Sequence, residues 1–205
     1  MDRFHTGIPR WGAVCLGFFD GLRGEAALVR DDTLSSGWLL RRREEYNAYC
    51  DLRIRKLKRR LAGPLQKTAD LLRVWNRFQA EAAVPLPDPA DGTVTVRQME
   101  AARQAHSRHE ANRNEAMAAL AQLTRLEVQI HNLLTQADED LRASAHSLRS
   151  LFYAYAKGAC RKRAVNEAQI EAIAVPRSAA EAIQPAGLLN ALDQVVNQEV
   201  YHVAV

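Results

Sequence analysis

Two histidines and a glutamate in the stretch "HSRHE" are the closest this chain comes to a catalytic or metal-binding set. His106 and His109 lie three positions apart, and Glu110 follows the second. On a helix this spacing brings both imidazoles to one face, where they can share a metal ion. Such a site also needs inward carboxylates, and the segment expected opposite supplies only Asp70 and Glu81. We therefore predict no metal and no cofactor here, but a polar end to a helical hairpin.

Catalytic motifs with a defined mechanism are not found in the sequence. No glycine-rich phosphate loop, G-x-S-x-G turn or H-E-x-x-H pair occurs. The chain is accordingly predicted to be non-catalytic, with no small-molecule substrate.

A run of basic residues, "RIRKLKRRL", is the most distinctive charged feature. Ile54, Leu57 and Leu61 share one helical face, so the basic side chains cover the remaining faces. A solvated helix flank has the same pattern, so charge balance has to separate the two interpretations. We take as the candidate binding residues Arg53, Arg55, Lys56, Lys58, Arg59 and Arg60.

The net charge of +4 comes from one part of the chain. Residues 37–64 hold nine basic and three acidic side chains, whereas residues 65–160 hold eleven of each. The two end segments, 1–36 and 161–205, each hold four basic and five acidic side chains. The positive excess therefore lies on the first half of one predicted helix.

The expected register between the two helices of the hairpin determines which basic residues lie opposite acidic ones. A turn near residue 89 would place Arg41 to Arg43 opposite the acidic triplet Asp138 to Asp140. Residues 53–60 would then face 119–126, "ALAQLTRL", which holds no carboxylate. We thus expect residues 53–60 to keep an uncompensated positive charge that attracts an anionic partner.

The chemistry of that partner stays open at this level. The run contains no aromatic residue, so base stacking is not expected from it, and no helix-turn-helix or zinc-finger spacing occurs. An acidic protein and non-specifically bound nucleic acid both fit the charge. A third alternative is an anionic membrane surface, aided by Trp11, Phe18 and Phe19.

Composition and cysteine usage favour a helical protein of the cytoplasm. Aromatic residues make up 6% of the chain, and the commonest residues include Ala, Leu, Arg, Gln and Glu, which favour helix. The three cysteines are scattered without C-x-x-C spacing, which indicates a reducing compartment. The apolar run from Trp11 to Phe19 is too short for a spanning helix and has no signal-peptide cleavage pattern.

We divide the chain into three parts. Residues 1–36 contain several glycines and are predicted to be irregular. Residues 37–160 form a long helical hairpin with a proline-rich turn at 84–94. Residues 161–205 form shorter C-terminal helices.

Start and stop signals bound the two long helices of the hairpin. The first is expected from about Gly37 to Ala83, after a serine cap at 35–36, with a kink or break at Gly63-Pro64. The second begins at a capping box formed by Thr95 and Gln98 and runs to about Lys157.

The second long helix carries an apolar seam with a mean spacing of 3.5 residues, as in a coiled coil. The seam consists of Leu120, Leu123, Ile130, Leu134, Leu141, Leu148, Leu151 and Tyr155. A matching stripe on the first helix consists of Cys50, Ile54, Leu57, Leu61, Leu65, Leu72, Trp75 and Phe78. The predicted fold is all-α: a long antiparallel helical hairpin, coiled-coil-like, with shorter C-terminal helices. The predicted function is a structural or adaptor subunit that docks a protein partner, or a second copy of itself, through this seam and the basic run.

Overall fold

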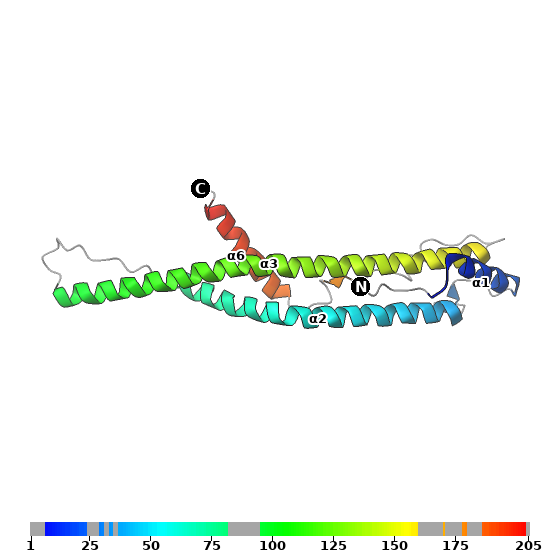
Figure 1. The fold of residues 1–205 in the computed structure, drawn as a ribbon, viewed down its shortest axis with the longest axis horizontal. Coiled ribbons are helices and arrows are strands. Elements are labelled where there is room, and N and C mark those ends of the chain that lie inside the picture. The colour runs from blue at the N-terminus through cyan, green and yellow to red at the C-terminus, as the bar shows by residue number, and fades with distance from the viewer. Residues whose placement is uncertain are drawn as a thin grey trace. The chain divides into compact units, whose positions relative to one another are not determined.

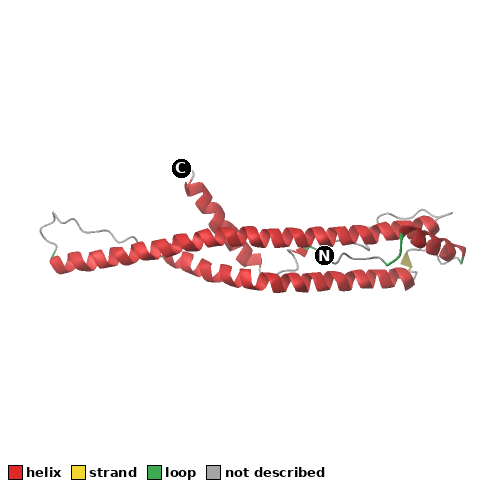
Figure 2. Cartoon of the chain, viewed as in Figure 1, coloured by secondary structure: helices red, strands yellow, loops and turns green. Residues whose placement is uncertain are grey.

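The computed structural model describes residues 7–23, 29–30, 33–34, 37–81, 95–159, 170, 178–179 and 186–203. The fold is all-α, as the sequence predicts (Figure 2). The helices are α1 (Arg10–Leu22), α2 (Gly37–Gln79), α3 (Val96–Ala159) and α6 (Ala186–Val203). A two-residue antiparallel ladder pairs β1 (Val29–Arg30) with β2 (Thr33–Leu34), with Val29 opposite Leu34.

The chain folds as two units, and both long helices contribute to each. The first unit comprises Met1–Arg59 and Leu133–Gln184, and the second comprises Arg60–Asn132 and Pro185–Val205. Within each unit α2 and α3 lie side by side and antiparallel (Figure 1). The predicted hairpin is therefore confirmed, although the proline-rich turn at 84–94 lies outside the described residues.

Local sequence signals predicted the start of each long helix correctly. α2 begins at Gly37, as expected, and ends at Gln79, four residues before the predicted end. α3 begins at Val96, directly after the predicted capping box. In that box the Thr95 amide donates to Gln98 Oε1 at 2.8 Å, and the Gln98 amide donates to Thr95 Oγ1 at 3.3 Å. Two otherwise unpaired donors are thereby satisfied at the helix start.

Of the kink or break expected at Gly63-Pro64, the break does not occur, because α2 continues through Pro64. A proline inside a helix removes one backbone hydrogen bond and costs about 3 kcal/mol. Burial of Leu57 and Leu61 before it and of Leu72 after it stabilises the helical course. The buried Thr68 hydroxyl donates back to the Pro64 carbonyl at 2.9 Å, so this hydroxyl is not left unpaired.

The apolar seam of α3 is largely buried inside this one chain. Leu123, Ile130, Leu141, Leu148, Leu151 and Tyr155 are buried, whereas Leu120 and Leu134 are half-buried. In the second unit the buried row also includes Ala116, Ala119 and Leu126. Ala119 and Leu126 each lie one position before a residue of the 3.5-residue pattern, Leu120 and Glu127 respectively. On α2 the stripe is equally consistent: Cys50, Leu57, Leu61, Leu72 and Trp75 are buried, and Ile54, Leu65 and Phe78 are half-buried.

The segment 1–36, predicted to be irregular, contains the helix α1. Each glycine in a helix costs about 1 kcal/mol relative to alanine, which is why the glycines at 12 and 17 argued against one. In the structure, glycines allow α1 and α3 to pack closely. A Cβ at Gly17 would lie 2.0 Å from the Tyr155 carbonyl oxygen, and one at Gly158 would lie 2.0 Å from that of Val14. The absence of side chains lets the α1 and α3 backbones touch.

Two polar and aromatic contacts complete this end of the first unit. Tyr155 Oη donates a hydrogen bond of 2.6 Å to Asp20 of α1. The Tyr155 ring also stacks on Trp38 of α2, with centroids 5.8 Å apart. Tyr155 thereby joins three helices.

The C-terminal portion is described in part. Of residues 161–185, where shorter helices are predicted, the structure describes Ile170, Ser178 and Ala179. The buried Ala179 donates its backbone amide to Asp138 on α3 at 2.6 Å. One of the predicted shorter C-terminal helices is α6, where Leu192 and Val196 are buried. Among the described helices, none has the length and apolar character needed to cross a lipid bilayer.

Candidate partner interface

The predicted basic run lies on α2, but its six residues do not share one environment. Arg53 is half-buried in the first unit, where its guanidinium bonds to the Asp140 carboxylate of α3. The same guanidinium lies over the Tyr49 ring, 5.8 Å from its centroid. Arg53 is therefore part of the packing between α2 and α3 rather than of an open surface.

The Arg53–Asp140 pair shows that the predicted register is wrong. Arg53 was expected opposite residue 126 and lies instead opposite Asp140, two heptads further along α3. The expected pairing of Arg41 to Arg43 with the acidic triplet is therefore also wrong. Arg42 pairs with Glu45 on its own helix at 2.7 Å, and Asp138 accepts from the Ala179 amide.

The cause of the shift is visible at the other end of α2, within the second unit. Asn112 donates to both Glu81 carboxylate oxygens at 2.9 and 3.0 Å. Residue 81 thus lies beside residue 112, so the first four turns of α3 extend beyond the end of α2. A register estimated from a symmetric turn at residue 89 cannot include such an overhang.

The remaining five basic residues are exposed, as their position off the apolar stripe predicts. We call them the basic surface: Arg55, Lys56, Lys58, Arg59 and Arg60, all exposed. The expectation that the run faces a stretch without carboxylates is wrong, because Arg53 lies beside Asp140. Arg55 Nε donates to the Asp51 backbone carbonyl at 3.3 Å, one turn earlier on the same helix. Within the described part of the chain, no carboxylate lies within ion-pair distance of any of the five.

The spacing of the five basic residues arranges their side chains on particular sides of α2. Arg55 and Arg59 are four residues apart, as are Lys56 and Arg60, so each pair projects from one side of α2. Lys58 lies between the Arg55–Arg59 pair and the buried stripe, on the opposite flank of α2 from Lys56 and Arg60. The result is two short rows of positive charge along α2.

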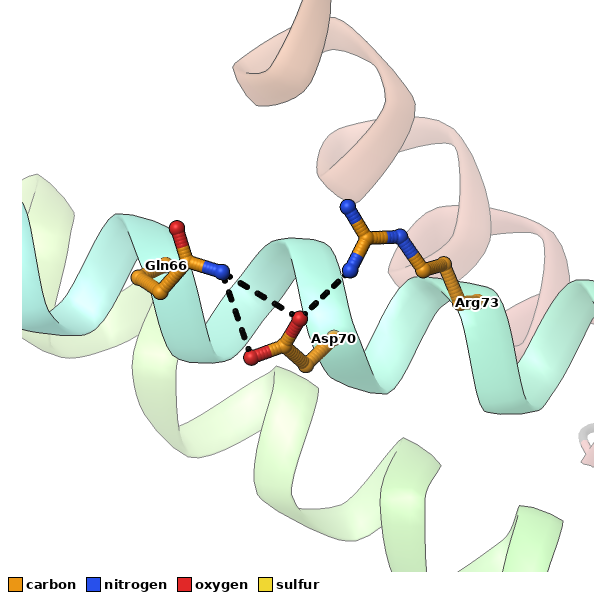
Figure 3. Close-up of polar contacts among 3 residues, drawn as sticks. All are labelled: Gln66, Asp70 and Arg73. Atoms are coloured by element: carbon orange, nitrogen blue, oxygen red, sulfur yellow. Dashed lines mark hydrogen bonds and ion pairs between the residues drawn. The ribbon is translucent and has the colours of Figure 1, made fainter.

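A contrasting arrangement follows further along α2, in the second unit (Figure 3). Asp70 accepts from Arg73 at 2.7 Å and from the Gln66 amide at 3.3 Å. The Arg73 charge is therefore compensated within its own helix, although 74% of its side chain is exposed. Exposure alone does not make a docking surface, and the basic surface differs because its charge is not compensated.

The two histidines lie in a polar cluster on the second unit. His109 Nδ1 is 3.8 Å from Glu81 Oε2, and its ring lies 5.5 Å from that of Phe78. His106 Nδ1 is buried without a hydrogen-bond partner among the described residues. No group of three or more His, Cys, Asp or Glu side chains with metal-binding geometry occurs in the described ranges. The cluster holds the end of α2 against α3.

Sequence reasoning missed one surface feature of the first unit and predicted another only in part, since it named Trp11, Phe18 and Phe19 as membrane contacts without predicting the helix that carries them. One is a shallow cavity of about 300 Å³, where Arg10 at the start of α1 lies near His146 and Ser150 of α3. The other is the outer face of α1, whose large apolar side chains are exposed. Both depend on where α1 packs, which nothing in the sequence of residues 1–36 indicates.

Comparison of the chain with protein-family models, with curated proteins and with solved structures gives no match in any of the three. The interpretation of its function therefore depends on the geometry described above.

Proposed function

We propose that this protein is a cytoplasmic, non-catalytic adaptor subunit that docks an acidic protein partner on the basic surface of α2. The observation that carries the proposal is the set of five exposed basic side chains at Arg55–Arg60 without a carboxylate partner among the described residues. Desolvating an uncompensated charge is costly unless a partner supplies the opposite charge, so this surface favours an anionic neighbour.

The spacing of the charges supports a helical protein as that neighbour. Rows at i and i+4 are matched by carboxylates at the same spacing on a partner helix. A helix packed beside α2 would extend the hairpin into a bundle of three, the arrangement that helical assemblies use repeatedly. Because the seam of α3 is buried within the chain, the partner is proposed to use this outer face of α2 rather than the seam.

Two variants test the proposal against wild type. The first replaces Arg55, Lys56, Lys58, Arg59 and Arg60 with glutamine and keeps Arg53, which holds the register. A matched control loses the same number of exposed positive charges from α3, with glutamine at Arg97, Arg103, Arg108, Arg125 and Arg142. Circular dichroism should show the helicity of wild type in both variants.

Binding is titrated against polyglutamate, a generic DNA duplex, single-stranded DNA and anionic vesicles, at low and physiological salt. We expect wild type and the α3 control to bind polyglutamate, and the α2 variant to lose at least about tenfold in affinity. Equal binding by both variants would reject a local docking surface. A marked preference for DNA, with a steep fall in affinity as salt rises, would replace the adaptor with a nucleic-acid accessory protein.

A further inference from the structure

The outer face of α1 carries a continuous apolar stripe. Trp11, Cys15, Phe18 and Leu22 follow one another at spacings of four, three and four residues, which places them on one side of the helix. Phe19 widens the stripe. These side chains are exposed, Trp11 by 71%, Phe19 by 57% and Leu22 by 70%.

The opposite side of α1 explains why the stripe faces outward. Ala13 and Gly17 are buried there, and Gly17 and Gly21 bring the α1 backbone against the backbone of α3 near Ala159. Asp20, the sole acidic residue of α1, lies on this inner side and accepts the Tyr155 hydrogen bond. The small residues and Asp20 thus fix α1 with its large apolar side chains directed away from the protein.

An exposed arginine lies at each end of this stripe. Arg10 and Arg23 are exposed at the two ends of α1. The α3 segment that the α1 backbone contacts, residues 155–159, holds Lys157 and no aspartate or glutamate. Aromatic and leucine side chains framed by basic residues are the composition of helices that lie in the interface of an anionic bilayer.

We infer that α1 is a membrane-surface helix, which inserts its stripe into the headgroup region of an anionic lipid surface while Arg10 and Arg23 contact the phosphates. A single helix of 13 residues presents a convex ridge. That area is small for a stable protein interface, which buries about 1,200–2,000 Å². A lipid surface, by contrast, conforms to a ridge. This inference concerns a different face from the basic surface and does not depend on the proposed function.

The test is co-sedimentation of the full chain with vesicles of phosphatidylcholine alone and of phosphatidylcholine with an equal part of phosphatidylserine. Wild type should bind the mixed vesicles more strongly. The variant Trp11→Ser/Phe19→Ser should partition at least about tenfold less, because two aromatic side chains no longer leave water. Both residues are exposed, so the fold should keep its helicity.

Two leucine variants test whether the apolar stripe of α1 binds the vesicles, rather than any exposed apolar side chain. Leu22→Ser removes a 70% exposed leucine from the stripe, and Leu52→Ser removes a 46% exposed leucine from α2. We expect Leu22→Ser to reduce partitioning by about threefold or more, and Leu52→Ser to leave it near wild type. The Leu22→Ser substitution is also made in the variant whose basic surface carries glutamine. At high salt, where charge is screened, Leu22→Ser should still reduce the partitioning of that variant into vesicles.

Two results would overturn the inference. One is the absence of wild-type binding to mixed vesicles, or equal binding by wild type and Trp11→Ser/Phe19→Ser. The other is a lower mass of Trp11→Ser/Phe19→Ser in sedimentation equilibrium without lipid, which would make the stripe an interface between copies of this chain.

Discussion

Arg53 of α2 and Asp140 of α3 form an ion pair that shows the register of the hairpin in the first unit. The two side chains are 23% and 26% exposed, so water screens their attraction only in part. Ser144 lies one turn along α3 and donates to the Asp140 backbone carbonyl at 2.7 Å. The pair therefore belongs to a local polar layer between buried apolar positions, and its removal should affect stability.

We predict a coupling free energy of about 1 kcal/mol between Arg53 and Asp140. It is measured by a double-mutant cycle of Arg53→Gln and Asp140→Asn, with urea unfolding followed by circular dichroism. The exposed Arg73–Asp70 pair of Figure 3 is the control, since its side chains are 74% and 54% exposed. Its coupling should be no more than about half as large. Strictly additive effects at Arg53 and Asp140 would show that the pair does not determine the register.

The contact between α1 and α3 should not tolerate a methyl group. Gly158→Ala places a Cβ 2.0 Å from the Val14 carbonyl oxygen. We expect a loss of about 1–3 kcal/mol in unfolding free energy, despite the better helix propensity of alanine. Gly63→Ala is the control, because nothing lies within 4 Å of a Cβ at that position. It should stabilise α2 by up to about 1 kcal/mol. Thermal unfolding distinguishes the two signs, and equal shifts would contradict the close packing of α1.

Two leucines of the predicted seam should differ in their contribution to stability. Leu148 is fully buried, so Leu148→Ala should cost about 2–5 kcal/mol in unfolding free energy. Leu134 is half-buried, and Leu134→Ala should cost less than half as much, since less apolar area returns to water. Urea titration of both variants makes the comparison. A larger loss at Leu134 would mean that a partner or second copy covers this part of the seam.

The polar cluster at the end of α2 should hold that end in place. Asn112→Ala removes both hydrogen bonds to Glu81, and we expect a local loss of about 1 kcal/mol. Amide hydrogen exchange at Phe78 and Gln79 should accelerate accordingly. Arg113→Gln, which removes an exposed pair with Glu110, should change the local stability by no more than about 0.5 kcal/mol. If amide exchange accelerated similarly in both variants, the effect would come from a general change in the polarity of the surface rather than from loss of the Asn112–Glu81 contact.

Much of the secondary structure was predictable because its signals are local. The capping box at Thr95 and the start of α2 at Gly37 follow from a few neighbouring residues. The exposure of the basic surface followed from the same periodicity, since Leu57 and Leu61 had to face inward. At Pro64 the expectation of a helix break is wrong, because burial of residues several turns apart offsets the cost of the proline.

Tertiary packing decided the rest. Register depends on which apolar rows fit together, and a two-heptad shift leaves a 3.5-residue pattern unchanged, so the sequence could not distinguish Asp140 from residue 126 as the neighbour of Arg53. Gly17 and Gly21 of α1 argue against a helix in the sequence, but the α3 backbone at Tyr155 and Ala159 packs against them. The sequence by itself determined two long amphipathic helices and an excess of positive charge on one of them. Only the packing of distant segments decided which charges are paired, and that α1 presents its aromatic side chains to the outside.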